Sequence, residues 1–319
     1  MDRRFLRLGA AAIGFAILLR LMGAGALQPL ALVLQRQELL SFLVYLETGR
    51  SVRYFGEIPQ ETAPNIRETF PKEEGEMPSF DETDLSALSV SYLCDQRPEL
   101  KALLQVPLEW DLTRDGPTVL ILHTHATESY TGEDNYRSLD EEKNMLSIGR
   151  EVERLLEGAG IGVIHDRELH DHPDYNGSYS SARAAVQGYL AKYPTIQLVL
   201  DLHRDAAATP GGQLVTSATV GGQRSAQLMM VVGTDSVSAH PNWQENLSLA
   251  LKLSAMLERE NPGICRPLQL RRQRFNLDLC PGSLLIEVGA AGNTHQEAVI
   301  AAHALAQAII ALSRGTTTA

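Results

Sequence analysis

The sequence predicts an α/β fold, with a largely parallel sheet of five or six strands and helices on both of its faces. Short apolar runs typical of buried strands alternate along the chain with longer segments whose apolar residues recur at helical spacing. The segments between strands are long enough to connect parallel neighbours. Three of the apolar runs also end in ionisable residues, and in open α/β sheets ligands bind at the carboxyl ends of the strands.

The first 36 residues differ in composition from the rest of the chain. Three arginines within the first seven residues precede an apolar run at 8–19, and Arg20 separates this run from an uncharged stretch at 21–34. Such a pattern is typical of an export signal or a membrane anchor, and the positive-inside rule places the remainder of the chain outside the cytoplasm. Although the Ala-Gly-Ala at 24–26 could serve as a cleavage site, we favour a retained anchor over residues 1–36. We therefore expect a single-pass protein of the cell membrane.

Residues 37–107 are predicted to separate this anchor from a folded domain. A short amphipathic helix is expected at 38–46, and residues 57–99 are rich in acidic residues and proline. Such a composition cannot bury enough apolar surface to fold alone, and its like charges repel one another. We therefore expect a flexible acidic linker up to residue 107 and a folded domain over residues 108–319.

The first half of this domain contains two predicted strands and two predicted helices. Residues 118–123 are a β-branched and leucine-rich run, as in a buried strand. Residues 143–159 repeat apolar side chains at helical spacing until two glycines end the helix. A second, short strand is predicted at 162–165, and a second helix at 179–193 is ended by Pro194.

The second half continues the alternation. Strands are predicted at 196–202 and, after a glycine-containing polar region, at 227–233. A helix at 245–260 is stopped by Asn-Pro-Gly, a fifth strand follows at 283–288, and a helix at 295–312 closes the domain.

Composition excludes some functions. The net charge is −11 and the aromatic share is 6%, so we expect no nucleic-acid partner, because phosphate binding needs clustered cations. The chain has three cysteines, Cys94, Cys265 and Cys280, and no two of them are spaced as in a CxxC motif. This spacing argues against a thiolate zinc site. A disulfide between Cys265 and Cys280 is conceivable outside the cytoplasm. Apolar filling of the core is the preferred interpretation of both cysteines.

Metal-capable side chains follow three of the predicted strands. The first strand is followed by His123, His125 and Glu128, the third ends in Asp201-Leu-His203-Arg204-Asp205, and the last contains Glu287. Because the carboxyl ends of parallel strands lie side by side, these residues should converge. Two imidazoles and a carboxylate are a common ligand set for catalytic zinc, and His125, Glu128 and His203 supply it. Glu287 would then be free to act as general base toward the attacking water.

Other polar residues are given supporting roles. Asp201 and Asp205 are expected to orient His203 or to pair with Arg204, rather than to bind the metal. The loop that carries His165, His170 and His172 is predicted to be a solvated face, and His240, His295 and His303 are predicted to be structural.

Several separated motifs resemble a known family. They are His125-Ala-Thr-Glu-Ser-Tyr130, Asp174-Tyr-Asn-Gly-Ser-Tyr179, Asp201-Leu-His-Arg-Asp205, and the run from Asn276 to Gly289 that continues to Asn293-Thr294. Together with the basic and apolar N-terminus and the acidic linker, they resemble the stage II sporulation protein P family over about residues 115–312. More distantly, the pattern is similar to that of the zinc N-acetylmuramoyl-L-alanine amidases.

The resemblance implies a zinc amidase-like fold and a peptidoglycan hydrolase. The bond cleaved would join the lactyl group of N-acetylmuramic acid to L-alanine of the stem peptide, and cross-linking peptides would be a second target. The family acts in a membrane complex with stage II sporulation proteins D and M during engulfment, which implies an extracytoplasmic catalytic domain at the septal or engulfing membrane.

The resemblance also implies roles for individual residues. It makes His203 a zinc ligand and Glu287 the catalytic acid–base. His125 is preferred to His123 as the second ligand, and Glu128 is preferred to Glu142, which opens the first helix where the distant amidases place their glutamate.

Two further family-motif residues receive looser roles. Arg204 would pair with an aspartate or with a carboxylate of the substrate. Asn293 would support the site or contact the substrate. A different class of function, a non-catalytic peptidoglycan-binding scaffold of a membrane complex, remains the alternative, and zinc content separates the two because a catalytic site should be filled.

Overall fold

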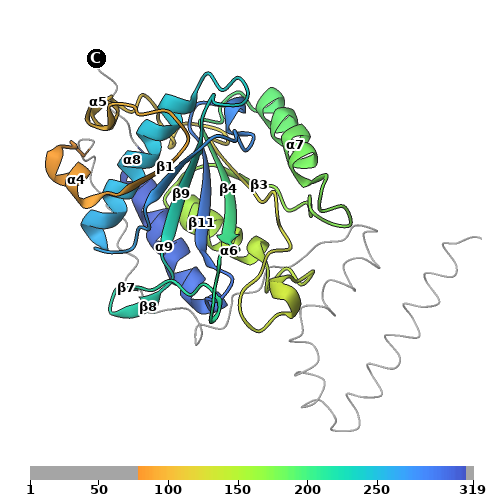
Figure 1. The fold of residues 1–319 in the computed structure, drawn as a ribbon. Coiled ribbons are helices and arrows are strands. Elements are labelled where there is room, and N and C mark those ends of the chain that lie inside the picture. The colour runs from red at the N-terminus through yellow and green to blue at the C-terminus, as the bar shows by residue number, and fades with distance from the viewer. Residues whose placement is uncertain (1–77, 314–319) are drawn as a thin grey trace, which may run out of the picture. The chain divides into compact units, whose positions relative to one another are not determined.

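The computed structural model describes residues 78–313, in which a seven-stranded sheet has the order β1-β10-β9-β11-β4-β2-β3 (Figure 1). The strands are β1 (Val90–Leu93), β2 (Val119–Leu122), β3 (Val163–His165), β4 (Leu198–Asp205), β9 (Leu228–Gly233), β10 (Leu268–Arg271) and β11 (Ser283–Ala290). Every neighbouring pair is parallel except β9 with β11. The prediction of a largely parallel sheet is thus confirmed, with seven strands rather than five or six.

Six α-helices and two small hairpins accompany this sheet in the described residues. The helices are α4 (Glu82–Ala87), α5 (Leu100–Gln105), α6 (Met145–Gly158), α7 (Ser178–Lys192), α8 (Trp243–Glu260) and α9 (His295–Ala311). The hairpins pair β5 (Ala208–Thr209) with β6 (Gly212–Gln213), and β7 (Ala218–Val220) with β8 (Gln223–Ser225). Two short 3₁₀ turns, η1 (Asp134–Tyr136) and η2 (Leu277–Leu279), complete the elements.

The two faces of the sheet are covered unequally. In β4, Leu198, Leu200 and Leu202 enter the large core that the sheet forms with α6, α8 and α9. Val199 belongs to the opposite face, where a smaller cluster includes Ala182 and Val186 of α7. Successive side chains of a strand point to opposite faces. Asp201 and His203 therefore lie on the α7 face, which has the thinner cover (Figure 1).

The predicted elements of the folded domain agree with the structure to within three residues. The five predicted strands correspond to β2, β3, β4, β9 and β11, and the four predicted helices to α6, α7, α8 and α9. The sequence did not predict β1 and β10, which are only four residues long each and form one side of the sheet.

The prediction that a flexible linker extends to residue 107 is wrong for its last part. Helix α4, strand β1 and helix α5 all lie before residue 108, and β1 pairs with β10. Asp84 of α4 forms two hydrogen bonds, of 2.6 and 2.7 Å, with the guanidinium of Arg259 in α8. Leu104 of α5 is buried in the main core. The predicted helix at 38–46 and the rest of the linker before residue 78 lie outside the described residues.

The predicted membrane location also requires correction. Between residues 78 and 313, the structure contains no helix that is both long enough and apolar enough to cross a membrane. The segment 1–36, from which that location was predicted, lies outside the described residues.

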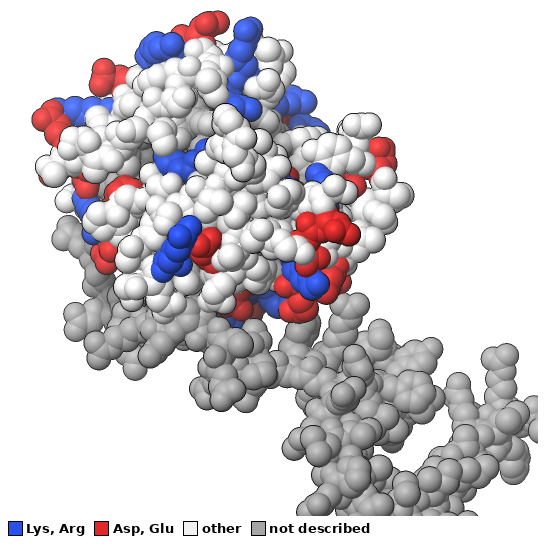
Figure 2. Space-filling model, turned by 60° about the horizontal axis from the view of Figure 1, so that its bottom comes forward, with Lys and Arg blue, Asp and Glu red and all other residues white. Residues whose placement is uncertain are grey.

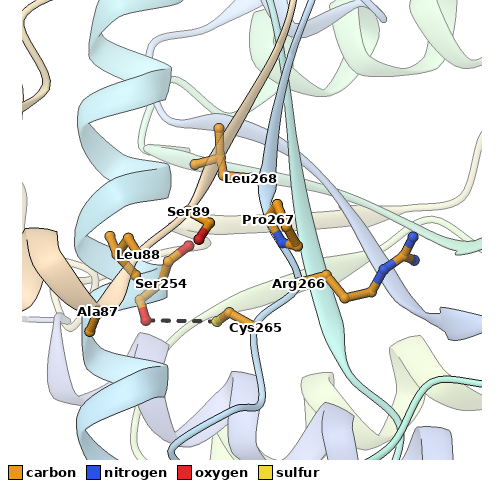
Figure 3. A pocket seen from close by; sticks show the side chains of 8 residues that line it. All are labelled: Ala87, Leu88, Ser89, Ser254, Cys265, Arg266, Pro267 and Leu268. Carbon is orange, nitrogen blue, oxygen red and sulfur yellow. Dashed lines mark hydrogen bonds between the residues drawn. The ribbon is translucent and has the colours of Figure 1, made fainter.

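The three cysteines are free, so the conceivable disulfide between Cys265 and Cys280 is not formed. Cys265 lines a small pocket of about 60 Å³, in which its thiol donates to the carbonyl of Ser254 (Figure 3). Cys280 packs in the cluster under α7, and burial raises the pKa of its thiol to about 11. A protonated thiol is a poor nucleophile and metal ligand, so Cys280 serves as apolar filling.

We expect Leu104→Ala in the full chain to lower the free energy of unfolding by about 2–5 kcal/mol, because it leaves a cavity in the main core. Leu93→Ala is the matched control, since this β1 side chain is 46% exposed and its loss should cost less than about 0.5 kcal/mol. Urea denaturation measures both. Two equally small effects would mean that the segment before residue 108 does not contribute to folding.

Candidate functional site

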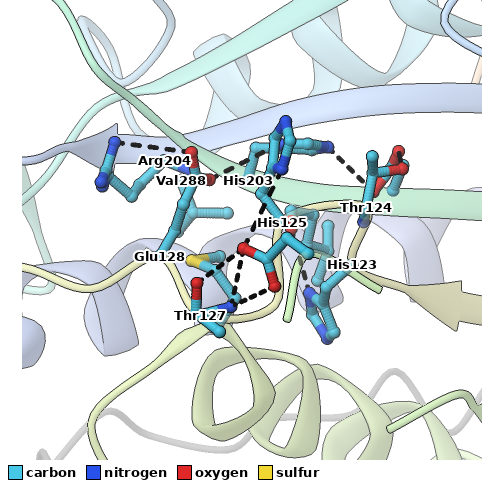
Figure 4. Close-up of polar contacts among 12 residues, drawn as sticks. His123, Thr124, His125, Thr127, Glu128, His203, Arg204 and Val288 are labelled. Atoms are coloured by element: carbon cyan, nitrogen blue, oxygen red, sulfur yellow. Dashed lines mark hydrogen bonds and ion pairs between the residues drawn. The ribbon is translucent and has the colours of Figure 1, made fainter. Parts of the chain in front are cut away.

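The carboxyl ends of β2, β4 and β11 bring the predicted site residues together. Strand β11 pairs with β4 in a register that sets Glu287 directly beside His203. Strand β2 pairs with β4 on the other side and is followed by a tight turn, in which the backbone N–H of Glu128 donates to the carbonyl of His125 at 3.0 Å. His125, Glu128 and His203 are thereby grouped around the end of β4 (Figure 4).

His203 lies between two carboxylates. Its Nδ1 is 3.5 Å from Glu128 Oε2, and its Nε2 is 2.9 Å from Asp201 Oδ1 without the geometry of a hydrogen bond. Burial opposes protonation of the ring, but Asp201 and Glu128 outweigh it and raise the pKa of His203 well above its ordinary value. The backbone N–H and the hydroxyl of Thr124 donate to Asp201 at 2.8 and 2.6 Å. Asp201 is therefore a fixed carboxylate that holds His203 in place.

Arg204 has a different role from the one predicted. Its backbone N–H donates to Glu128 Oε2 at 3.2 Å, and its Nη1 lies 3.5 Å from Glu128 Oε1. Its other guanidinium nitrogens donate to the carbonyls of Ser129 and Tyr136, at 2.9 and 2.8 Å. The carboxylate beside Arg204 is thus Glu128 rather than an aspartate, and this buried side chain ties the loop after β2 to the end of β4.

His125 is surrounded by residues for which the sequence gave no role. Its ring stacks on Tyr175 with centroids 4.6 Å apart and meets Tyr179 edge-on at 5.6 Å. Its Nδ1 lies 3.9 Å from Asp171 Oδ2, and its ring centroid is 5.4 Å from that of His203. Burial, despite the nearby Glu128, lowers the pKa of His125, which favours the neutral ring that a metal requires.

The sequence signal for these neighbours was the motif at 174–179, which contains both tyrosines. Tyr175 lies in the loop before α7 and Tyr179 in the first turn of that helix, so helical spacing does not explain why both contact His125. The loop before them was predicted to be solvated, and this is wrong for His165, His170 and Asp171, whose side chains are all 0% exposed. It holds for His172, which is exposed.

Glu287 is the most perturbed carboxyl of the site. Burial raises its pKa to about 8; Glu128 and Asp205 add to this rise, and His203 opposes it. Its Oε2 atom is buried and has no hydrogen-bond partner among the described residues. A carboxyl with such a pKa gains and loses its proton near neutral pH.

Three buried polar atoms without hydrogen-bond partners meet in this site: His125 Nδ1, His203 Nε2 and Glu287 Oε2. Each unsatisfied buried group costs about 1–3 kcal/mol. His203 Nε2 has the carboxylate of Asp201 at 2.9 Å, so His125 Nδ1 and Glu287 Oε2 are the two atoms that indicate a missing partner. The neutral imidazole of His125 beside a carboxylate and a second imidazole matches the chemistry of a zinc ligand set. The donor atoms of His125, Glu128 and His203 do not all lie within 4.8 Å of one another, so the set is not closed around one point.

Within residues 78–313, a different group has three donor atoms that all lie within 4.8 Å of one another. It consists of Asp166, Glu168 and His170. Both nitrogens of His170 already have partners, at 2.9 Å from Asp166 and 2.8 Å from Ser181. Glu168 is exposed. These contacts satisfy His170 without an ion.

The alternate ligands lie elsewhere. His123 Nδ1 is 3.0 Å from the Leu202 carbonyl, and His123 Nε2 is 2.9 Å from His165 Nε2, so both nitrogens are used on the α6 side of the sheet. The side chain of Glu142 is 70% exposed and pairs with Arg150 at 2.6 Å. The structure therefore groups Glu128, and not Glu142, with His203.

Asp205 and Asn293 act away from the centre of the site. Asp205 pairs with Arg266 at 2.7 Å. Asn293 is fully buried; its side-chain oxygen accepts from Thr216 and from the Ala290 N–H, and its amide donates to Glu297. Asn293 thus fastens the turn after β11, and the structure gives it no face toward a substrate.

We expect Gly149→Ala in α6 to destabilise the protein by about 1–3 kcal/mol, because a Cβ there would lie 2.5 Å from His123 Nε2 and 2.6 Å from His165 Nε2. Gly188→Ala in α7 is the control: its Cβ would meet no atom within 4 Å, so the change should stabilise the helix by about 0.5–1 kcal/mol. Thermal unfolding reports both. A stabilised Gly149→Ala protein would contradict the packing of the two histidines against α6.

Comparisons with known proteins place the chain in a family. The model of the family described as Stage II sporulation protein P matches residues 46–310. Stage II sporulation protein P of Bacillus subtilis (strain 168) is 30% identical over 210 residues, which are 61% of this chain and 50% of that protein. The chain thus spans about half the length of this relative.

Solved structures with some likeness include two amidases. The CwlD amidase from Clostridioides difficile, in complex with the GerS lipoprotein, gives a TM-score of 0.40 at 15% identity over 60% of this chain and 96% of that one. The N-acetylmuramoyl-L-alanine amidase AmiC2 of Nostoc punctiforme gives 0.39 at 15% identity over 61% and 97%. The family match covers most of the chain, from residue 46 to residue 310, and the chain therefore belongs to the stage II sporulation protein P family.

Proposed function

We propose that the chain is a zinc-dependent peptidoglycan hydrolase of sporulation that cleaves the N-acetylmuramoyl-L-alanine amide bond. The observation that carries the proposal is the meeting of His125, His203 and Glu287 at the ends of three strands, where His125 Nδ1 and Glu287 Oε2 are buried without hydrogen-bond partners. Membership of the stage II sporulation protein P family supplies the biological setting. Cross-linking peptides are a second candidate substrate, and sporulation proteins D and M are the proposed partners.

His125, Glu128 and His203 would hold the zinc ion. When bound, zinc supplies a Lewis acid that polarises the scissile carbonyl and acidifies water. Asp201, fixed by Thr124, orients His203, and Arg204 holds Glu128 against the end of β4. Such outer contacts set the orientation of the ligands.

Glu287 would move the proton. It accepts the proton of the attacking water as the oxygen bonds to the lactyl carbonyl carbon, and it returns a proton to the L-alanine nitrogen as the C–N bond breaks. Its position beside His203 and its pKa of about 8 suit both directions of transfer.

The choice of glutamate ligand can be tested by zinc content. We expect Glu128→Gln to reduce zinc in the purified full chain to less than about a tenth of an equivalent, because a neutral amide is a poor ligand. Glu142→Gln should retain about one equivalent, since Glu142 is exposed and pairs with Arg150. Elemental analysis by mass spectrometry measures both. Loss of zinc in Glu142→Gln but not in Glu128→Gln would make Glu142 the ligand. Absence of zinc from the unmodified chain would exclude the proposed metal site.

The role of Glu287 predicts a first effect of Glu287→Gln on activity, with zinc content as the control, and a second effect on stability. Release of stem peptides from purified sacculi should fall by about 10²–10⁴-fold, because the amide cannot carry the proton. Loss of a proton carrier should leave zinc content unchanged. Activity like that of the unmodified chain would exclude Glu287 as the base.

The second effect concerns stability in the presence of chelator. The pKa of Glu287 rises from 4.5 to about 8 on folding, so the folded state holds this proton while the unfolded state releases it. Stability should therefore fall as pH rises from about 4.5 to about 8. At pH 8 the Gln variant should be more stable by about 1–3 kcal/mol, and at pH 4 the two should be equal. An unchanged difference across this range would show that Glu287 titrates normally.

A further inference from the structure

A pocket of about 330 Å³ lies next to His125. Its walls include Arg137, Leu139, Asp171 and Tyr175. Tyr175 is also the ring that stacks on His125, and Asp171 lies 3.9 Å from His125 Nδ1. The pocket thus begins one side chain away from a proposed zinc ligand. A substrate group close to the cleaved bond could reach it.

Arg137 is held rigidly in the wall of this pocket. Its Nη1 donates to Thr127 Oγ1 at 2.7 Å and to Asp171 Oδ2 at 2.8 Å, and its Cζ lies 4.5 Å from the centre of the Tyr175 ring. The side chain is still 34% exposed, and no hydrogen bond from Nη2 or Nε is found within the described part of the chain. A fixed guanidinium with a free edge is suited to bidentate binding of a carboxylate.

The charge of Asp171 offsets part of the charge of Arg137, but the carboxylate of Asp171 is not itself exposed to a ligand. Its side chain is fully buried behind Arg137 and is also bonded by the N–H and hydroxyl of Thr127. A ligand therefore meets the guanidinium, and not Asp171, at the surface of the pocket.

Apolar side chains stand at the mouth of the pocket. Leu139 is 57% exposed and Tyr175 is 49% exposed, and they are two of the six strongly exposed large hydrophobic residues between 78 and 313. Exposed apolar groups beside a fixed cation suit a ligand with both aliphatic and anionic parts. A peptide that carries a free carboxylate has this chemistry.

We propose that this pocket binds the free carboxylate of the second stem-peptide residue and so selects acidic stems over amidated ones. The proposal rests on the proposed function, because the stem peptide must lie along His125 for its second residue to reach Arg137. The second residue of the stem is glutamate linked through its side chain, and its main-chain carboxyl is either free or amidated. The pocket distinguishes these two forms.

The test compares two small probes, N-acetylmuramoyl-L-alanyl-D-glutamate and its D-isoglutamine amide. Calorimetry with the zinc-loaded full chain carrying Glu287→Gln, which prevents turnover, should show the acid binding about tenfold tighter. Arg137→Gln, added to that chain, should bring the acid to the affinity of the amide. Arg137→Lys should recover part of the difference in affinity between the acid and the amide, because lysine keeps the positive charge but cannot form the two parallel hydrogen bonds of a guanidinium. Equal binding of acid and amide by the starting chain would overturn the proposal.

A second variant separates ligand binding from the internal role of Arg137. Leu139→Asp leaves the contacts of Arg137 in place and adds a negative charge at the mouth, so it should weaken acid binding about threefold to tenfold and spare the amide. Val237→Asp is the matched control. Val237 is 61% exposed and follows β9, whose carboxyl end lies at the opposite edge of the sheet, so neither probe should be affected. The opposite result would be an unchanged affinity for both probes in Leu139→Asp, together with an equal loss of affinity for both probes in Arg137→Gln. It would mean that Arg137 only stabilises the loops it connects and does not bind the ligand.

Hydrolysis of the same probes by the unmodified chain keeps the two proposals apart. Cleavage of acid and amide at equal kcat/KM, with equal affinities, would reject the pocket and leave the amidase proposal standing. Selective binding of the acid without cleavage of either probe would reject the amidase proposal and support the pocket.

Discussion

The pairing of β11 with β4 is the interaction on which the site depends. Glu287 and His203 are direct partners in this register, and a slip of either strand by one residue would send the ionisable side chain of that strand to the opposite face of the sheet. The register is fixed from the other side of the sheet. Leu200 and Leu202 of β4 and Ile286 of β11 are buried in the core under α6, α8 and α9. Burial of these apolar residues forces the ionisable ones onto the α7 face.

Burying these ionisable side chains costs free energy of folding, and hydrogen bonds and ion pairs within the site compensate part of it. Asp201 is bonded by Thr124, and Glu128 is bonded by the backbone and held near the guanidinium of Arg204. His125 and Glu287 keep buried atoms without hydrogen-bond partners. A structural network would satisfy these atoms internally, whereas a binding site leaves them for its ligand.

On the face of the described residues in Figure 2, acidic and basic side chains are interspersed around a largely uncharged surface, so no field of one sign surrounds that face.

The sequence predicted the central strands and helices because long periodic patterns there agree with the tertiary structure. The convergence of His125, Glu128, His203 and Glu287 followed from a rule about parallel sheets and needed no side-chain detail. The short strands β1 and β10 carry too few residues for a pattern to be visible. The acidic and proline-rich composition before residue 108 also concealed α5, whose burial depends on α8, which is distant in sequence.

The surroundings of His125 could not be predicted in the same way. Asp171 and Tyr175 come from a polar loop whose burial depends on contacts with Thr127 and Arg137. The local sequence shows that such a loop is polar, but it does not show which distant residues the loop contacts. For Arg204, the sequence suggested the wrong partner. Arg204 is close to two aspartates in the sequence, but the carboxylate beside its guanidinium in the structure is the buried Glu128. In both cases, contacts between distant segments decided the outcome.

The most direct test of this account is the identity of the bond cleaved in purified peptidoglycan. Mass spectrometry of sacculi digested with the zinc-loaded full chain should find stem peptides with a free L-alanine amino group and glycan strands with bare lactyl carboxylates. Stem peptides that remain bound to muramic acid, whether shortened at their cross-links or left intact by a protein that binds sacculi without cutting them, would contradict it.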